Sequence, residues 1–416
     1  MSTPNVIIIG AGLAGLACAR ELVQQGYQPL VLEAADAPGG RVRTDVHEGF
    51  RLDRGFQVLQ TAYPEARRQL DYAALDLRPF RPGALIRWQG RFHRLGDPWR
   101  HWSDALPTLF SPIGTLADKV RIAWVRRRVL QSTLAELYAR PETTALEALR
   151  AAGLSDRMIN GFLRPFLAGV FFDEELTVSS RAFAFVFRAF AAGDTALPAQ
   201  GMGAIPAQLA AGLPSDTLRL NCRVERLDAP VVLLASGERL TAPAVVIATD
   251  GFETARLLAE PSWPGARATT CLYFAAPEPP VREPLLVLNG EGAGPINSLV
   301  VPSVLSPAYA PPGQALVTVN VLGDPAGDDH ALLAAVSQQL RDWFGPGVEA
   351  WRRLRIYRIA RALPLQTPPV SFPETFSPLV RPGLFVCGEY RSAPSIQWAL
   401  ASGRHTGEAV AAVLRA

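Results

Sequence analysis

The chain has 416 residues, of which 49% are hydrophobic and 19% are charged. This composition excludes global disorder and provides enough apolar material for about two or three domains. The 41 Lys and Arg residues nearly balance the 38 Asp and Glu residues, which leaves a formal net charge of +3. Such a balance gives no reason to expect a nucleic acid as a partner.

The four cysteines lie far apart in the sequence, and no two have the spacing of a metal site or a redox pair. Scattered thiols of this kind indicate a reduced, intracellular protein. The five histidines form no HxH or HxxxH pair, so we expect no metal site. Neither a signal peptide nor a transmembrane helix is predicted. We therefore expect a cytoplasmic protein, with any membrane contact peripheral.

The first elements form a recognisable unit. Residues 6–9 are apolar and β-branched, which predicts a buried parallel strand. The segment GAGLAG follows at residues 10–15, and a helix then runs to Gly26. A second strand over residues 29–33 ends on Glu33. This order predicts a strand–helix–strand unit with a glycine-rich turn at its first crossing.

The residue types in this unit are those that a dinucleotide requires. Gly10 permits the tight turn, Gly12 lets the backbone approach a pyrophosphate, and Gly15 lets helix and strand pack closely. The helix N-terminus offers free N–H groups to the phosphates. The Glu33 carboxylate can accept hydrogen bonds from ribose hydroxyls, which disfavours NADP. FAD and NAD both remain possible on these residues alone.

The later elements follow in chain order. Residues 76–102 are rich in Pro, Arg and Trp and carry no clear pattern, whereas residues 103–166 read as helices broken at Pro112, Pro141 and Gly153. A β-meander is predicted over residues 218–227, 231–235 and 245–249. Further strands are expected at 268–275, 284–289, 296–301, 315–322 and 351–359, and a helix at 329–344. The chain closes with a strand at 384–387, a loop and a final helix.

Two segments allow both a structural and a functional interpretation. Eight phenylalanines lie between residues 162 and 190, and they are typical either of a helical core or of an apolar channel wall. Residues 114–130 combine five basic side chains with apolar ones. Because the charges fall on several sides of a helical wheel, the pattern favours a solvated helix over a membrane-surface helix.

The segment GGRVR at residues 39–43 decides between FAD and NAD. With it, residues 6–44 resemble the flavin-containing amine oxidase, phytoene desaturase and protoporphyrinogen oxidase-like superfamily. Residues 51–57, 198–206, 222–227, 248–250, 384–389 and 395–403 resemble further segments of that superfamily. The resemblance implies FAD as the cofactor, and it implies that Arg41 and Arg43 lie near the pyrophosphate or the isoalloxazine.

By the same resemblance, the cofactor-binding residues are spread over both ends and the middle of the chain. They are Gly10, Gly12, Leu13, Ala14, Gly15, Glu33, Ala34, Gly39, Gly40, Arg41, Val42, Gly55, Phe56, Gln57, Val224, Ala248, Thr249, Gly388, Glu389, Ser395, Ile396, Gln397 and Ala399. No catalytic residue is identified, because flavin N5 performs the chemistry. Tyr390, Trp398 and Gln57 are the candidates for lining the active site.

The expected function is that of an FAD-dependent oxidoreductase, a dehydrogenase, desaturase or oxidase. It would transfer a hydride from an apolar small organic substrate, of which isoprenoid-like compounds are one candidate class, to flavin N5, with O2 or a quinone as electron acceptor. The alternatives are a flavin amine oxidase, a monooxygenase reduced by NAD(P)H, and a non-catalytic FAD-binding protein. The amine oxidase alternative is weakened because Lys119, the single lysine, lies far in sequence from every flavin motif.

The expected fold class is α/β. A discontinuous Rossmann-like FAD-binding domain would take residues 1–75, 195–260 and 375–416. An α+β substrate domain would take the rest, with helices from 76–194 and a mixed sheet from 261–374. The active site would lie between the two, at the carboxyl ends of the strands of the FAD domain.

Overall fold

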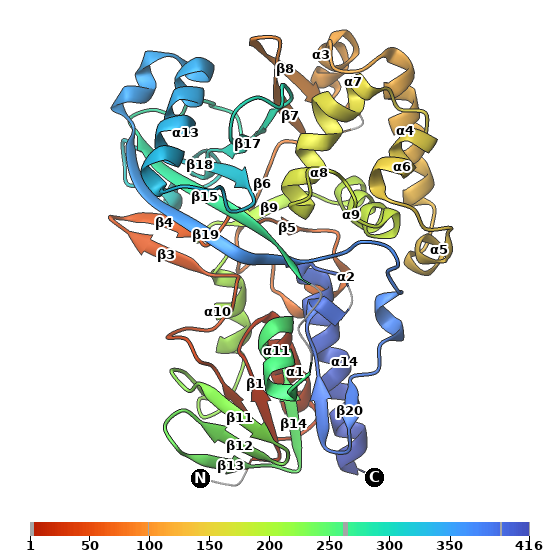
Figure 1. Cartoon of the computed structure of the whole chain (residues 1–416), viewed down its shortest axis with the longest axis vertical. Coiled ribbons are helices and arrows are strands. Elements are labelled where there is room, and N and C mark those ends of the chain that lie inside the picture. Colours follow the sequence, from red (N-terminus) through yellow and green to blue (C-terminus); the bar gives the residue numbers. More distant parts are fainter. Residues whose placement is uncertain (1–3, 99, 261–264, 392, 416) are drawn as a thin grey trace.

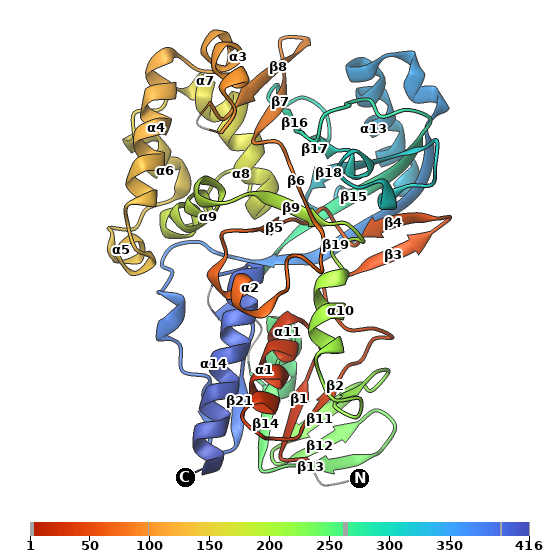
Figure 2. The same ribbon diagram turned by 180° about the vertical axis from the view of Figure 1, so that it is seen from behind.

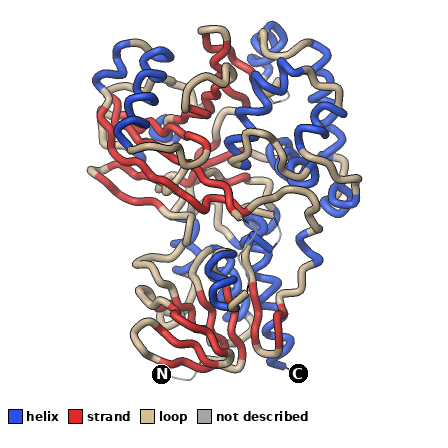
Figure 3. The backbone as a smooth tube through the Cα atoms, viewed as in Figure 1, coloured by secondary structure: helices blue, strands red, loops and turns tan. Residues whose placement is uncertain are grey.

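The computed structural model describes residues 4–98, 100–260, 265–391 and 393–415. Figures 1 and 2 show a lower part, which holds both chain ends, and a wider upper part. In Figure 3 the strands of the upper part gather on one side, together with the helix of residues 329–344, and most of its other helices lie on the opposite side. The chain passes between the two parts several times, so each is assembled from segments that are distant in the sequence.

The lower part is built on a six-stranded sheet in the order β10-β2-β1-β14-β21-β20. All neighbouring strands run parallel except β20, which is antiparallel to β21. This is the Rossmann-like arrangement that the sequence predicts. The strands are β1 (Val6–Ile9), β2 (Pro29–Leu32), β10 (Leu218–Arg219), β14 (Ala244–Ile247), β20 (Leu379–Arg381) and β21 (Leu384–Val386).

The central strand β1 is fully buried because both faces of the sheet are covered. Val6 and Ile8 pack in the core that includes helices α1 (Leu13–Gln24) and α14 (Ile396–Arg415). Ile7 and Ile9 point the other way, into a core shared with a small antiparallel sheet. Since successive side chains of a strand alternate between faces, a continuous apolar run is what such a position requires.

The small sheet corrects part of the predicted meander. It consists of β11 (Val224–Asp228), β12 (Val231–Leu234) and β13 (Arg239–Thr241). The single strand expected over residues 218–227 is wrong: Asn221 has a φ of 55°, which ends β10 and starts a separate β11. Residues 245–249 are not in the meander either, because Val245, Val246 and Ile247 pair with β1 and β21.

The upper part contains a seven-stranded mixed sheet in the order β19-β15-β18-β17-β16-β7-β8. Leu272 and Phe274 face helix α13 (Asp329–Phe344), whereas Cys271 and Tyr273 face the main core. The expectation of helices alone over residues 76–194 is wrong, because β7 and β8 come from the unassigned Pro- and Arg-rich segment. The strands are β7 (Gly83–Trp88), β8 (Arg91–Gly96), β15 (Ala266–Ala276), β16 (Leu286–Asn289), β17 (Ile296–Val300), β18 (Ala315–Leu322) and β19 (Arg352–Pro364).

Short helices cover the other side of the upper part, and the predicted breaks at Pro112, Pro141 and Gly153 are confirmed. These helices are α3 (Ala105–Phe110), α4 (Leu116–Leu130), α5 (Leu134–Ala139), α6 (Ala145–Ala151), α7 (Asp156–Met158), α8 (Arg164–Phe171) and α9 (Ser180–Ala192), with a π-helical turn, η2, at Ile159–Leu163. Among the described residues, no helix has both the length and the apolar character needed to cross a membrane.

Smaller elements connect the two parts. A hairpin of β3 (Thr44–His47) and β4 (Phe50–Asp53) and a sheet in the order β5-β9-β6 lie between the large sheets. The remaining strands and α-helices are β5 (Leu59–Gln60), β6 (Leu77–Pro79), β9 (Thr195–Pro198), α2 (Pro64–Gln69), α10 (Ala204–Ala211), α11 (Gly251–Leu258) and α12 (Pro302–Leu305).

Candidate active site

A cavity of about 970 Å³ is lined by residues of both the lower and the upper part. One half is formed by the glycine-rich turn after β1, the 39–43 loop and the segments that follow β14 and β21. The other half is formed by α8, α9, the turn η2 and the mixed sheet. The cavity therefore joins the nucleotide-type motifs of the sequence to its phenylalanine-rich segment.

The three glycines of the first turn have different roles. A Cβ on Gly15 would lie 2.0 Å from the carbonyl oxygen of Gly10, and a Cβ on Gly10 would lie 2.8 Å from that of Ala248. These two positions need glycine because the backbones approach so closely. Gly12 lines the cavity and has nothing within 4 Å of an added Cβ. The space beside Gly12 is thus open for a ligand that lies against the backbone.

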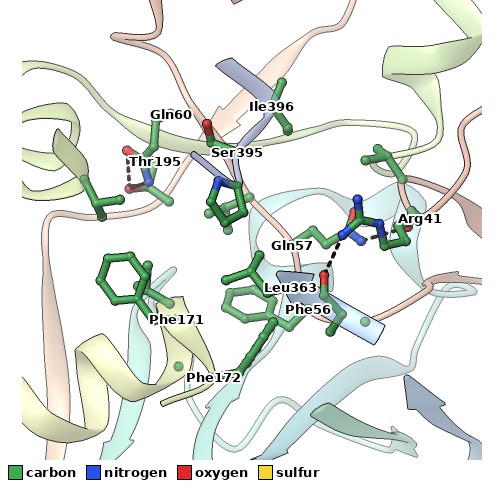
Figure 4. Close-up of a pocket in the computed structure, with 18 of the residues that line it drawn as sticks. Arg41, Phe56, Gln57, Gln60, Phe171, Phe172, Thr195, Leu363, Ser395 and Ile396 are labelled. Carbon is green, nitrogen blue, oxygen red and sulfur yellow. Dashed lines mark hydrogen bonds between the residues drawn. The ribbon is translucent and has the colours of Figure 1, made fainter. Parts of the chain in front are cut away.

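Two helix N-termini meet at this half of the cavity. Gly12 caps α1 without a side-chain hydrogen bond, and Leu13 and Ala14 of its first turn line the cavity. Ser395 and Ile396 at the start of α14 line it as well (Figure 4). The positive ends of both helix dipoles therefore point toward one place, which favours anionic groups there.

The close packing of α1 against α14 holds the two N-termini together. A Cβ on Gly403 would lie 2.1 Å from the carbonyl oxygen of Ala14. The two helices run side by side in both ribbon views. A larger residue at position 403 would push the start of α14 away from the start of α1.

The Glu33 side chain is fixed by backbone donors. Its Oε2 accepts a hydrogen bond from the Ala11 N–H at 2.7 Å, and its Oε1 accepts one from the Ala35 N–H at 2.9 Å. The carboxylate lines the cavity at the end of β2. Each oxygen keeps a further lone pair, so the fixed carboxylate can still accept from a diol.

A polar cluster lies where the two halves of the cavity meet. Arg41 forms an ion pair with Glu389, and its Nη1 donates to the carbonyl oxygen of Ala362 at 2.9 Å. The negative charge of Glu389 raises the pKa of the Arg41 guanidinium above its ordinary value. The Gln57 Nε2 donates to the Arg41 carbonyl oxygen at 2.9 Å (Figure 4). The Gln57 Oε1 is buried and has no hydrogen-bond partner in the structure. Because buried polar atoms are normally hydrogen-bonded, this oxygen can accept a hydrogen bond from a bound ligand.

Aromatic rings line the other half of the cavity. Six of the eight phenylalanines between residues 162 and 190 contribute to the lining, so this segment forms a cavity wall as well as a core. Phe183 and Phe185 are the two that are buried in the core instead. The six that line the cavity are Phe162, Phe166, Phe171, Phe172, Phe187 and Phe190.

Phe172 has an unusual backbone conformation. It ends α8 with a φ of 52° and a ψ of 37°, in the left-handed region that a bulky residue rarely adopts. Its ring lines the cavity near Phe171 and Leu363 (Figure 4). Strained backbone of this kind is found where surrounding structure holds a side chain in a required position.

The structure places most of the predicted cofactor-binding residues together. All of them line the cavity except Gly15, which packs against Gly10, and Gln397, whose Oε1 accepts from the Glu65 N–H at 2.8 Å. Arg43, in contrast to Arg41, does not line the cavity and pairs with Asp36 at 2.9 Å.

Two of the three candidate active-site residues do not line the cavity. Trp398 is buried against Phe185 and Phe372, because its position on α14 turns it into the core. The partly buried Tyr390 ring packs against the core shared with the small sheet, and its hydroxyl donates to Thr254 at 2.9 Å. The expectation that these two residues line the active site is corrected accordingly. Gln57 alone of the three lines the cavity.

The contribution of β19 to the cavity was not predicted from the sequence. Ile359, Arg361 and Leu363 line the cavity, and two of them lie beyond residue 359, where this strand was predicted to end. Their spacing of two residues is the signal that could have found them, since alternate residues of a strand share a face. Gln60 and Thr195 carried no signal in the sequence, although the Gln60 Nε2 donates to the Thr195 hydroxyl at 3.0 Å (Figure 4).

A buried carboxyl group connects the lower and upper parts beside the cavity. Asp53 accepts from the Thr44 hydroxyl, from the Met202 N–H at 2.9 Å and from the Tyr309 hydroxyl at 2.9 Å. The Tyr273 hydroxyl donates to its carbonyl oxygen at 2.5 Å. Burial raises the pKa of Asp53 to about 6 despite these three donors to its side chain.

The comparison with protein families identifies the chain. Residues 13–411 match the sequence model of the family described as flavin containing amine oxidoreductase. The chain belongs to this family. FAD is the cofactor of the family and hence of this chain, and the protein is a flavin-dependent oxidoreductase. The open space at Gly12, the fixed Glu33 carboxylate and the two helix N-termini fit the pyrophosphate and ribose of FAD.

Individual relatives are similar over different shares of the chain. A phytoene dehydrogenase of Streptomyces griseus is 27% identical over 409 residues, which cover 84% of this chain and 76% of that protein. The putative flavin-containing monoamine oxidase AofH of Mycobacterium tuberculosis is 29% identical over 164 residues. That match covers 39% of this chain and only 33% of AofH. A histone demethylase homologue of Arabidopsis thaliana matches over just 6% of its length.

Solved structures support the fold. An oxidoreductase from Methanosarcina mazei has a TM-score of 0.76 at 18% identity, with 97% of this chain and 99% of that chain covered. A putative protoporphyrinogen oxidase from Exiguobacterium has a TM-score of 0.74 at 19% identity, with 99% of each chain covered. The α/β fold with a Rossmann-like FAD domain and a substrate domain is thereby confirmed.

The glycine geometry predicts a contrast between two variants. Gly12→Ala places its methyl group in the open space beside the cavity, so it should leave the stability of the apoprotein unchanged and weaken FAD retention. Gly15→Ala meets the Gly10 carbonyl oxygen and should lower the thermal midpoint of the apoprotein. Flavin content after gel filtration and thermal unfolding of apoprotein measure the two effects. Gly347→Ala, at another position with open space, is the control, and full flavin occupancy in Gly12→Ala would contradict the assignment.

The raised pKa of Asp53 predicts a pH-dependent stability. Folding raises the pKa of this acid from 3.8 to about 6, so the native state binds more protons than the unfolded state in that interval. Asp53 therefore costs stability as the pH rises from about 4 to about 6. Relative to wild type, Asp53→Asn should gain up to ~3 kcal/mol of unfolding free energy across this window. Urea unfolding at several pH values measures it, and a pH-independent difference would refute the buried-charge interpretation.

Proposed function

We propose that this oxidoreductase removes a hydride from an apolar, isoprenoid-like organic substrate. The observation that carries the proposal is the wall of six phenylalanines opposite the FAD-binding residues in one cavity. Aromatic rings of this number provide a large apolar surface and no hydrogen bonds to lose when a hydrocarbon binds. The similarity to a phytoene dehydrogenase over most of the chain agrees with this substrate class.

The chemistry comes from the cofactor and the environment from the chain. FAD, when bound, would supply a hydride acceptor at N5, and we propose O2 or a quinone as the oxidant that would take up the two electrons. The phenylalanine wall excludes water and holds a substrate C–H toward the middle of the cavity. The start of α14 stabilises negative charge beside it, and the free Gln57 Oε1 accepts one hydrogen bond from the bound molecules.

The charges around the cavity favour a neutral substrate over an alkylammonium ion. Glu389 is paired with Arg41, and Asp97 lies 3.5 Å from Arg100 and 4.0 Å from Arg126. The other described carboxylates of the lining belong to the dinucleotide half, so an ammonium ion on the phenylalanine wall would lack a counter-ion. The single lysine, Lys119, donates to the carbonyl oxygens of Leu109 and Ser111 at the end of α3.

This proposal assigns cofactor binding and substrate binding to different segments of the chain. We infer that residues 1–75, 195–260 and 375–416 bind FAD and that residues 76–194 and 261–374 bind the substrate. The support is the distribution of the lining residues, since Gly12, Glu33 and Ser395 come from the first set and Phe166 and Leu363 from the second.

The first experiment is an absorbance spectrum of the purified holoprotein, followed under anaerobic conditions. We expect flavin bands that persist with NADH and NADPH and bleach with an apolar donor such as a carotenoid precursor solubilised in detergent. Bleaching by either nucleotide would instead indicate a monooxygenase or reductase. Bleaching by alkylamines and not by apolar donors would indicate an amine oxidase. Flavin that stays oxidised with every donor would indicate a non-catalytic protein.

The strained conformation of Phe172 gives a second test. Phe172→Gly removes the ring and relieves the left-handed backbone, whereas Phe172→Ala removes the ring and keeps the strain. We expect the glycine variant to be about 1 kcal/mol more stable than the alanine variant in urea unfolding. Both should raise the KM for an apolar donor by roughly tenfold, because they lose the same buried ring surface. An unchanged KM in both would remove Phe172 from the substrate site.

A further inference from the structure

Exposed apolar side chains are concentrated on one surface of the upper part. Of the twelve large hydrophobic residues that are exposed in the described part of the chain, seven lie between residues 102 and 124, with exposed fractions from 46% to 88%. We call this surface the α3–α4 face. Its apolar residues are Trp102, Leu106, Leu109, Phe110, Leu116, Val120 and Trp124.

Helical spacing aligns the apolar residues of α4, and one hydrogen-bonded side chain connects α4 to the end of α3. On α4 the residues Leu116, Val120 and Trp124 are four apart and therefore form one stripe along the helix. Lys119 donates to the carbonyl oxygens of Leu109 and Ser111 and so ties the end of α3 to α4. In Figures 1 and 2 these helices lie on the outside of the upper part, away from the chain ends. Apolar surface of this extent on a protein exterior indicates an interaction site.

The charges on this face have one sign. Arg127 and Arg128 are exposed and continue the stripe of α4, and the Arg128 guanidinium lies 5.3 Å from the Trp124 ring. The only two acidic residues between positions 100 and 130 are buried and engaged inside the protein. They are Asp104, which pairs with Arg81, and Asp118, which accepts from Thr115 and Ser155.

We propose that the α3–α4 face docks on the surface of an anionic lipid bilayer. Tryptophan and phenylalanine beside arginine are the side chains that suit the boundary between acyl chains and charged headgroups. Uniform positive charge without exposed acids matches a negative surface, whereas a second copy of this chain would present the same positive charge. The apolar rings insert, and Arg127 and Arg128 contact the headgroups.

The inner side of the same helices lines the cavity, which connects the docking surface to the proposed function. Thr108 of α3 and Ile122 and Arg126 of α4 line the cavity that holds the phenylalanine wall. A bilayer on the outer side would therefore lie next to the substrate half of the cavity. This step rests on the proposed function, since only an apolar substrate would reach the cavity from a membrane.

The test is co-sedimentation of the holoprotein with vesicles, which requires neither substrate nor turnover. We expect binding to vesicles of phosphatidylcholine and phosphatidylglycerol in equal parts, weaker binding to phosphatidylcholine alone, and a loss of binding at high salt. Phe110→Ser combined with Trp124→Ser should weaken binding by at least ~10-fold, and Arg127→Gln by about fivefold. Val46→Ser and Val413→Ser remove exposed apolar residues elsewhere and should leave binding unchanged.

Three results would overturn the proposal. They are an absence of vesicle binding by wild type, equal losses in the control variants, and a dimer in sedimentation equilibrium that Phe110→Ser with Trp124→Ser converts to a monomer without any vesicle binding. The last result would assign the α3–α4 face to a second copy of the chain. Flavin reduction by a detergent-solubilised apolar donor is measured separately, so failure of the docking and failure of the proposed function are distinguishable.

Discussion

The close approach of three backbone segments is the constraint on which the cofactor site depends. Gly15 brings α1 against the turn at Gly10, and Gly403 brings α14 against Ala14. These contacts hold both N-termini at the cavity, where their helix dipoles would stabilise the negative charge of bound FAD. The two ends of the chain are thus packed against each other before any ligand contributes, and Gly403 permits the close approach of α14 to α1.

The lower part was largely predictable because short sequence patterns determine its main elements. The apolar run of β1, the glycine spacing and the acid at position 33 each require one arrangement, and the structure brings them together around the cavity. The prediction of a β-meander was wrong at Asn221. The left-handed backbone of this residue divides the predicted strand into two strands, which belong to different sheets. The sequence pattern alone could not assign β14 to its sheet, since a buried strand has the same apolar pattern in the six-stranded sheet as in the small sheet.

The upper part was less predictable because its site residues are defined by tertiary contacts. Tyr390 and Trp398 flank a flavin motif in sequence, yet the helical turn at the start of α14 directs the Trp398 ring into the core. Conversely, Leu363 lines the cavity because β19 continues beyond its predicted end. Some aromatic residues of α8 and α9 are buried in the core, and others line the cavity. The packing of the helices against their neighbours decides which rings are buried and which line the cavity, and the periodicity of the sequence does not encode that packing.

The composition of α4 illustrates how two roles can obscure a pattern. A wheel of this helix shows charges on several sides, which suggested a simple solvated helix. The structure separates them: Lys119, Ile122 and Arg126 belong to the cavity side, while Leu116, Val120 and Trp124 form an outer stripe that continues into Arg127 and Arg128. Two of the three cavity-side residues, Lys119 and Arg126, are basic and donate to carbonyl oxygens, so charged residues lie on the inner side of this helix and apolar residues on its outer side. Because two arginines also lie on the outer side, the sequence of the helix shows no clear amphipathic pattern, and only the exposure of each side chain separates the two surfaces.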